Sequence, residues 1–276
     1  MTATENQNDG DWATRGPYWA KTAPESVSTT DDLNQLLITL AGIEFGSDVL
    51  DIASGAGDPA ISIALKVGAE GSVTALDASA EMLAGARKRA IKLGLENITF
   101  ENGRMEALPF DASTFDAVTC RFGLMSSKDP VLALQEARRV LKSGKKTAYL
   151  THGSREKNSL FLVLWSAVFE FLGDKDNDDR GARRYKFSEK GSLETVFAAA
   201  GFSHIEEREV AKTVVKKKGE RFWQTMLIRA FGARIEGFEE SKMEALHACI
   251  ESAFEPYLNG DQYELLSTDM VASGIA

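Results

Sequence analysis

A glycine-rich turn next to a carboxylate is the strongest chemical signal in this sequence. Residues 49–60, VLDIASGAGDPA, lead from an apolar run into Asp51 and then turn through Gly55 and Gly57. Glycine adopts the backbone conformations of a sharp turn at little cost, and it leaves bare peptide groups against which a ligand can lie. A plain connection between a strand and a helix has the same composition, so the neighbouring residues have to decide between a ligand site and an ordinary turn.

Two classes of nucleotide fit the turn. The letters GAGDPA match the dinucleotide fingerprint G-x-G-x-x-A, and Asp77 follows about 20 residues later, where a ribose-binding acid is expected. A pyrophosphate would meet the carboxylates of Asp51 and Asp58, whereas S-adenosylmethionine has no phosphate and carries an ammonium and a cationic sulfur. The charges therefore favour S-adenosylmethionine over NAD. Asp77 can accept hydrogen bonds from both ribose hydroxyls in either case.

The elements that position this turn alternate between strands and helices. Asp58 is expected to cap the helix that follows the turn, with Pro59 as its first residue. Apolar periodicity, caps and glycine stops predict strands at 48–53, 72–76, 97–101, 115–122 and 146–151, and helices at 29–42, 61–67, 80–93 and 130–141. This alternation predicts an α/β fold of the Rossmann-like type, in which helices cover both faces of a mostly parallel sheet.

The pattern changes after residue 152. The sequence predicts an apolar helix at 160–172, an exposed charged loop at 174–184, a helix at 193–200, a strand at 203–210, helices at 220–232 and 238–256, and an extended run at 263–271. Ligands bind at the carboxyl ends of parallel strands, and helices inserted near that edge often roof the site. The first dozen residues are polar, and we expect them to be loosely attached.

Composition excludes several classes of function. The chain has 276 residues with 32 Lys and Arg against 41 Asp and Glu, and the net charge of −9 disfavours a nucleic-acid partner. No apolar run reaches the ~18 residues that a membrane span needs, so no integral membrane contact is expected. The two cysteines, Cys120 and Cys249, lack metal-ligand spacing. We therefore expect no metal site, a cytoplasmic compartment with reduced thiols, and a small-molecule partner.

Four segments of the chain resemble one enzyme family in order and spacing. They are VLDIASGAGDPA, LDASAEML (76–83), NGRMEALPFDASTFDAVTCRFGLM (102–125) and ARRVLKSGKKTAYL (137–150). Together they resemble the class I S-adenosylmethionine-dependent methyltransferases, in particular the ubiquinone and menaquinone C-methyltransferase group. The resemblance implies a seven-stranded sheet and one methyltransferase domain over 1–276. Its parts are a cofactor-binding core at 46–152, an N-terminal cap at 1–45, and lid and substrate-side segments at 155–188 and 213–258.

The resemblance also implies roles for individual residues. The methionine part of the cofactor would be held by Asp51 and the backbone of Ala53, Gly55 and Gly57. The ribose and the adenosine would contact Asp77, Ala78 and Met82. Met105 would flank the adenine, and Arg121 would lie beside the methionine end through its backbone carbonyl.

One position departs from the family pattern. Arg104 stands where many relatives carry an acid that accepts a hydrogen bond from the adenine amino group, and arginine cannot accept one. Arg104 can instead stack on the ring, bind the acceptor or face solvent, and Glu106 is a substitute acceptor. Ala53 replaces the first glycine of the family's loop, a small change that should fit.

Methyl transfer from a sulfonium is an in-line displacement of an already activated group. The protein mainly has to align the reactants and exclude water, so no obligatory catalytic signature exists. A base is needed only when the acceptor loses a proton. His152 is the candidate base because it follows the fifth strand at the cofactor edge; a histidine that merely ends a strand is the alternative interpretation.

Aromatic residues suggest an apolar pocket. The acceptor pocket is predicted to involve Trp12, Tyr18, Trp19, Phe122, Met125, Tyr185 and Phe187, with Phe161, Trp165 and Trp223 as further walls. Helical spacing of Phe161 and Trp165 is also typical of plain core packing. The letters CRFGLM after the fourth strand replace the Asn-Pro-Pro-Tyr type of motif, which lowers the case for nucleic-acid N-methylation.

The leading interpretation is a methyltransferase, monomeric or homodimeric, that acts on a small quinone-like or aromatic acceptor. A second interpretation is a module of the same fold that binds the cofactor without turnover and supports a partner protein. A nicotinamide-dependent oxidoreductase is the third.

Overall fold

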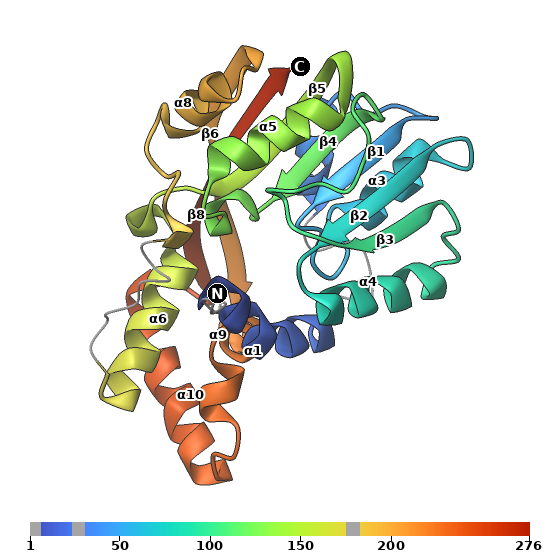
Figure 1. Ribbon diagram of the computed structural model, residues 1–276. Coiled ribbons are helices and arrows are strands. Elements are labelled where there is room, and N and C mark those ends of the chain that lie inside the picture. The colour runs from blue at the N-terminus through green and yellow to red at the C-terminus, as the bar shows by residue number, and fades with distance from the viewer. Residues whose placement is uncertain (1–6, 24–30, 175–182) are drawn as a thin grey trace, which may run out of the picture.

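A twisted sheet forms the centre of the computed structural model, which describes residues 7–23, 31–174 and 183–276 (Figure 1). Its main path runs in the order β3-β2-β1-β4-β5-β8-β6, and a two-residue strand, β7, pairs with β8. Strands β1 to β5 are parallel, and β8 is antiparallel to both β5 and β6. The strands are β1 Asp48–Ile52, β2 Ser72–Asp77, β3 Ile98–Asn102, β4 Phe115–Arg121, β5 Leu141–His152, β6 Ser203–Lys217, β7 Leu258–Asn259 and β8 Gln262–Ile275. The Rossmann-like prediction is confirmed.

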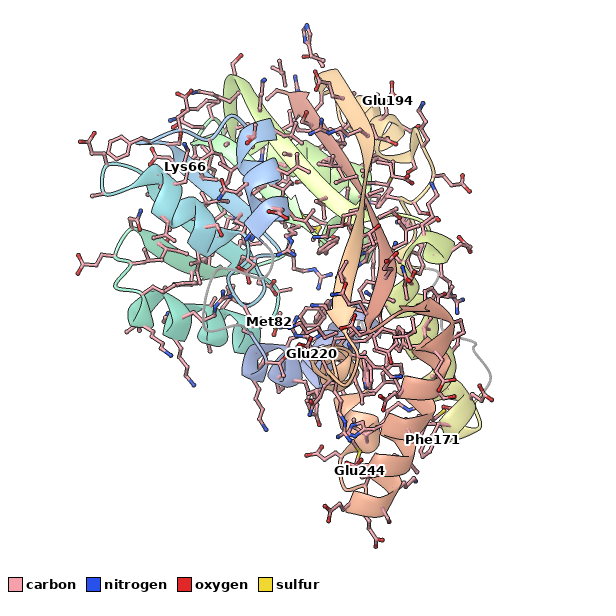
Figure 2. All side chains as sticks on the ribbon, turned by 180° about the vertical axis from the view of Figure 1, so that it is seen from behind. Lys66, Met82, Phe171, Glu194, Glu220 and Glu244 are labelled. Carbon is pink, nitrogen blue, oxygen red and sulfur yellow. The ribbon has the colours of Figure 1, made fainter. Side chains whose placement is uncertain are left out.

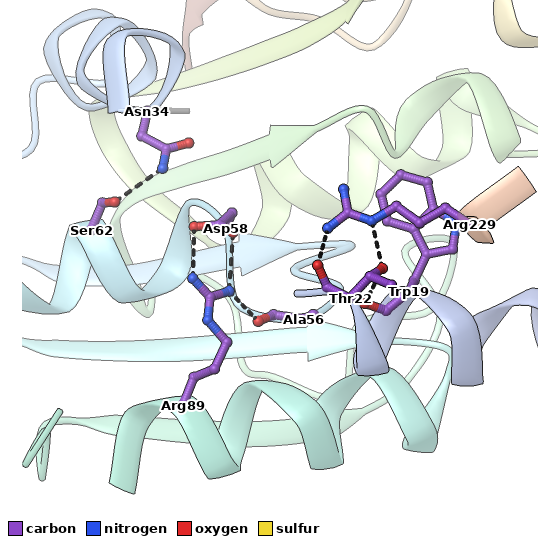
Figure 3. Close-up of polar contacts among 8 residues, drawn as sticks. All are labelled: Trp19, Thr22, Asn34, Ala56, Asp58, Ser62, Arg89 and Arg229. Carbon is purple, nitrogen blue, oxygen red and sulfur yellow. Dashed lines mark hydrogen bonds and ion pairs between the residues drawn. The ribbon is translucent and has the colours of Figure 1, made fainter. Parts of the chain in front are cut away.

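Helices cover both faces of the sheet, as predicted. One face packs against α5 (Pro130–Val140) and α8 (Ser192–Ala199), with Leu134 and Phe197 fully buried. The other packs against α2 (Asp31–Leu40), α3 (Ala60–Val67) and the end of α4 (Ala80–Lys92). A hydrogen bond of 3.0 Å from Asn34 to Ser62 joins α2 to α3 inside that layer (Figure 3). Apolar residues at helical spacing therefore become the two layers of one sandwich.

A third group of helices lies beyond the carboxyl ends of the parallel strands. It consists of α6 (Ser159–Leu172), α9 (Gln224–Ile235) and α10 (Glu240–Phe254), which share a hydrophobic core of their own (Figure 1). The described residues also form short 3-10 helices at Leu124–Ser126, Arg155–Lys157 and Glu255–Tyr257. Strands β6 and β8 are longer than predicted because they continue past the sheet into this group. Residues 213–217 of the predicted lid segment are therefore strand.

The N-terminal prediction is wrong for residues 7–12. They belong to helix α1, Gln7–Lys21, which packs between α4 and α9. A Cβ on Gly16 would come within 3.0 Å of Ser79 Oγ and 3.7 Å of Met82 Cγ, so the helix lies close against the start of α4 (Figure 2). Polar composition suggested a loose segment, but small residues such as Gly16 let this helix approach its neighbours. Residues 1–6 lie outside the described part of the chain.

Two negative findings apply to the described residues only. Among them, no helix combines the length and apolarity that a membrane crossing requires. The same residues contain no cluster of three or more His, Cys, Asp or Glu side chains that could hold a metal ion.

Candidate active site

The turn after β1 adopts a conformation that requires glycine. The backbone φ is 55° at Gly55 and 105° at Gly57, in the left-handed region. A Cβ at Gly55 would lie 3.0 Å from Met82 Cε, and a Cβ at Gly57 would lie 2.8 Å from Ile61 Cδ1. Ala53 also has a positive φ of 55°. Its methyl group occupies the space that a Cβ on Gly123 would need, so Ala53 fits here because residue 123 is a glycine.

Asp77 ties the turn to the end of β2. Its Oδ2 accepts a hydrogen bond of 2.8 Å from the Gly55 amide, and its Oδ1 accepts one of 2.8 Å from the Ser79 amide. Burial raises the pKa of Asp77, and these amide hydrogen bonds oppose the rise. The Ala78 amide also lowers the pKa of Asp77. A carboxylate has about four lone-pair sites, so the group can still accept from a ribose.

Asp51 is completely buried in β1. Thr119 of β4 donates to its Oδ1 at 2.7 Å, while Oδ2 has no hydrogen-bond partner among the described residues. Burial raises the pKa of Asp51 to about 8. A buried carboxylate oxygen without a donor beside a glycine turn is suited to an ammonium group, and the site therefore fits the methionine end of S-adenosylmethionine.

Asp58 does not cap helix α3, which corrects the prediction. The helix begins at Ala60, its N-cap position is Pro59, and no side chain bonds there. Asp58 is instead paired with Arg89 of α4, at 3.0 Å and 3.4 Å, and Arg89 also donates to the Ala56 carbonyl (Figure 3). The turn is thus braced from α4. Because Asp58 is neutralised and the pKa of Asp51 is high, charge opposes a pyrophosphate less strongly than the sequence indicated.

The residues predicted around the adenosine lie at the rim of this turn. Ala78 is exposed, while Met82 is buried and approaches Gly55. Met105 packs against the core under α5. Arg104 places its Nε 3.8 Å from Oε2 of Glu106, whose other oxygen accepts a 2.6 Å hydrogen bond from Ser127. Contacts of these residues with an adenine stay a prediction.

His152 ends β5 in a buried aromatic setting. Phe122 stacks on the imidazole with 4.2 Å between ring centroids and 18° between planes. Phe122 itself has a φ of 56°, an unusual conformation for a bulky residue that is typical of functional sites. Phe161 meets the imidazole edge-on at 5.1 Å, and Tyr185 lies 6.4 Å away. Two of the predicted pocket residues, Phe122 and Tyr185, are therefore brought to the predicted base.

Two charged residues hold the imidazole. Nδ1 of His152 lies 3.4 Å from Oδ1 of Asp269, longer than an ordinary hydrogen bond, and Nε2 lies 3.3 Å from Nη1 of Arg184. Arginine can only donate, so Nε2 accepts and the proton of the neutral ring is assigned to Nδ1. Burial lowers the pKa of His152 to about 4.

Sequence reasoning missed both partners of His152. Asp269 reaches His152 because β8 pairs antiparallel with β5, which places the two residues opposite each other. No local sequence motif predicts this register. Arg184 comes from the charged loop region and lies over Phe161 at 4.5 Å and Trp165 at 5.0 Å. Phe161, whose helical spacing is more often a sign of plain core packing, thus belongs to the His152 cluster.

Two predicted pocket residues lie in the hydrophobic core instead. Met125 is 6% exposed and Phe187 is 3% exposed, and both pack in the layer under α5 and α8. Apolar residues near a strand end look alike in sequence whether they face a pocket or the core, so contact of these two residues with an acceptor stays a prediction. Trp223 is buried in the helical group.

The aromatic residues of α1 divide between two tasks. Tyr18 donates to Glu236 at 2.7 Å and its ring lies against Gly232, so it fastens α1 to α9. Trp19 lies beneath the guanidinium of Arg229 at 4.6 Å and edge-on to Trp12 at 6.0 Å. Arg229 also donates to the hydroxyl and carbonyl oxygens of Thr22, at 2.9 Å and 2.7 Å (Figure 3). This arginine was not predicted, because only the tertiary arrangement brings α9 to α1.

Comparison with known proteins identifies the family of this site. The sequence model of the ubiE/COQ5 methyltransferase family matches residues 30–218. A demethylmenaquinone methyltransferase of Staphylococcus epidermidis is 33% identical over 180 residues, which are 61% of this chain and 73% of the relative. The ubiquinone/menaquinone biosynthesis C-methyltransferase UbiE of Cellvibrio japonicus is 32% identical over 189 residues, 64% of this chain and 76% of that protein.

Solved structures agree on the fold. Phosphoethanolamine N-methyltransferase 2 of Haemonchus contortus, in complex with S-adenosyl-L-methionine, has a TM-score of 0.56 at 19% identity, covering 97% of this chain and 57% of that chain. The cyclase SpnF has a TM-score of 0.64 at 18% identity, covering 98% of this chain and 95% of that chain. At these identities the two structures bear on the fold alone.

Proposed function

Because the chain belongs to the ubiE/COQ5 methyltransferase family and is an S-adenosylmethionine-dependent small-molecule methyltransferase, we propose that its acceptor is a quinone-like or other aromatic ring bound beside His152. The observation that carries this proposal is the aromatic setting of His152, with Phe122 stacked on it at 4.2 Å and Phe161 edge-on at 5.1 Å. Such a setting suits a flat apolar ligand.

The residues around the glycine turn fit the cofactor. Asp51 would receive the ammonium, Asp77 the ribose hydroxyls, and the bare turn at Gly55 and Gly57 would take the methionine part against its backbone. When bound, S-adenosylmethionine supplies an electrophilic methyl group. Helix α1, with Trp19 next to Arg229, would cover the site and exclude water.

His152 would accept the proton that the acceptor loses. Above its pKa of about 4 the imidazole is neutral, so its Nε2 lone pair is available at neutral pH. Asp269 near Nδ1 would stabilise the imidazolium that forms. Arg184 now faces Nε2 at 3.3 Å, so it would have to withdraw before the acceptor hydroxyl could donate to that nitrogen.

The remaining assignments of the sequence stay part of this proposal. Residues 1–276 would form a single domain with its core at 46–152, its cap at 1–45 and its lid at 155–188 and 213–258. The free thiols of Cys120 and Cys249 support a cytoplasmic compartment. We propose a monomer or homodimer without a nucleic-acid partner.

A radiolabel transfer assay with a panel of naphthoquinols and substituted phenols tests the acceptor. We expect transfer to at least one aromatic compound and, in His152→Gln, a loss of turnover of about 100-fold with unchanged affinity for S-adenosylhomocysteine, in the range of a lost general base. Aliphatic amines serve as comparison acceptors. Transfer to amines alone would overturn the proposal. Tight S-adenosylhomocysteine binding without transfer to any compound would favour the non-catalytic module instead.

A further inference from the structure

Arg121 is a largely buried cation that lacks a counter-ion at the centre of the site. It ends β4 between the glycine turn and the His152 cluster, and its Nε has no hydrogen-bond partner among the described residues. Burial lowers the pKa of Arg121, which measures how poorly its charge is solvated. Leaving a guanidinium in this state costs free energy, which a ligand with a hydrogen-bond acceptor at Nε would recover.

Three carboxylates lie near Arg121, but none of them is paired with it. Asp51, Asp58 and Asp269 all act electrostatically on Arg121. Yet Asp51 accepts from Thr119 at 2.7 Å, Asp58 is paired with Arg89 at 3.0 Å, and Asp269 lies 3.4 Å from His152. No carboxylate lies within ion-pair distance of Arg121 in the described part of the chain. The arginine is therefore shielded by distant negative charge but contacted by none of it.

The position of Arg121 relates it to the acceptor. Its guanidinium carbon lies 5.1 Å from the centroid of Phe122, and the same ring is stacked on His152. Arg121 also lowers the pKa of His152, so the two side chains are electrostatically close. In the predicted lid segment, Arg229 interacts electrostatically with both Arg121 and Asp58. The cation of Arg121, the ring of Phe122 and the neutral imidazole of His152 thus lie next to one another in that order.

We infer that Arg121 binds an ionised oxygen of the methyl acceptor, so that the enzyme selects acidic aromatics such as hydroxyquinones and phenols over neutral rings. This inference rests on the proposed function, since it places the acceptor beside Phe122 and His152. An enolate or phenolate oxygen at the guanidinium would supply the missing hydrogen-bond acceptor. It would also fix the acceptor ring against the ring of Phe122.

Calorimetry with a matched pair of ring compounds tests the inference. The probes are 2-hydroxy-1,4-naphthoquinone, which is ionised at neutral pH, and its methyl ether, which is not, each titrated into protein saturated with S-adenosylhomocysteine. In Arg121→Met we expect affinity for the hydroxy compound to fall about 10-fold or more, as for a lost charge-assisted hydrogen bond. Affinity for the methyl ether and for S-adenosylhomocysteine should change less than about 2-fold. Arg121→Lys should retain part of the preference for the ionised probe.

The controls separate the possible failures. The exposed Arg208→Met on β6 should leave every affinity unchanged. Thermal unfolding of Arg121→Met should stay close to that of the wild type, because removal of a poorly solvated charge offsets the lost contact with the Phe122 ring. If Arg121→Met weakens S-adenosylhomocysteine and not the hydroxy compound, Arg121 serves the cofactor carboxylate and the inference is wrong. It is also wrong if the wild type binds S-adenosylhomocysteine but not the hydroxy compound. Failure of the wild type to bind S-adenosylhomocysteine would refute the proposed function itself.

Discussion

The protonation of single residues in this site affects stability and ligand binding, and Asp51 is the clearest case. It is fully buried, one oxygen has no donor among the described residues, and burial raises its pKa to about 8. Its pKa in an unfolded chain is about 3.9, so between about pH 4 and pH 8 the folded protein binds one proton more than the unfolded chain. The contribution of Asp51 to stability therefore falls as the pH rises through that window. An incoming ammonium would reverse the preference and draw the proton off.

We expect S-adenosylhomocysteine binding at pH 7 to release close to one proton, because its ammonium favours the ionised carboxylate of Asp51. Calorimetry in phosphate and in Tris, whose ionisation enthalpies differ, measures that number. Asp51→Asn should bind without releasing the proton, and its stability should decline less than that of the wild type between pH 5 and pH 8. Equal binding enthalpies in both buffers for the wild type would contradict the assignment.

Helices and strands were predicted where local sequence patterns determine them. They were missed where tertiary contacts determine them. The strands and helices from 31 to 141 lie within a few residues of the prediction, because period, caps and glycine stops are local signals. Helix α1 was missed since its stability comes from packing on α4 and α9. The site followed the same division. Asp77 and Gly55, which local sequence assigned to the cofactor, meet at the turn, whereas Asp269 and Arg229 reach the site only through the folding of segments distant in sequence.

The contact between helices α1 and α9 can be tested by adding one methyl group at Gly232. Gly232 lies inside α9, where alanine is the better helix former by ~1 kcal/mol, but its Cβ would overlap the ring of Tyr18. We therefore expect Gly232→Ala to release α1 and to speed trypsin cleavage after Lys21, as followed by mass spectrometry. In a Tyr18→Ala background the same substitution should have no further effect, because the overlapping ring is gone. Equal acceleration in both backgrounds would show that the α1–α9 contact is not the cause.

Of the three hydrophobic cores that the described residues form, the one under α2 and α3 and the one in the helical group share two strands. Val271 of β8 and Val210 of β6 pack in the core of the sheet, while Leu265 and Val214 of the same strands pack among α6, α9 and α10. The family match ends at residue 218, so it includes the glycine turn and His152 but not α9, α10 or Asp269. The matched part thus contains the glycine-turn residues that we propose hold the cofactor, and β6 and β8 connect it to the helices outside the match. We expect the two cores to unfold together because separating them would break β6 and β8 in the middle.

The distribution of tryptophan makes this cooperativity measurable. All four tryptophans lie outside the parallel strands: Trp12 and Trp19 are on α1, Trp165 is on α6, and Trp223 directly precedes α9. Fluorescence therefore reports the helical group together with α1, whereas far-ultraviolet circular dichroism reports the entire chain. Leu246→Ala removes a fully buried side chain of α10 and should cost about 2–5 kcal/mol. With shared strands, both signals should move to lower denaturant concentration together, and the midpoints should coincide in variant and wild type. An earlier fluorescence transition in the variant, with the circular dichroism change lagging behind, would mean that the helical group unfolds independently of the sheet.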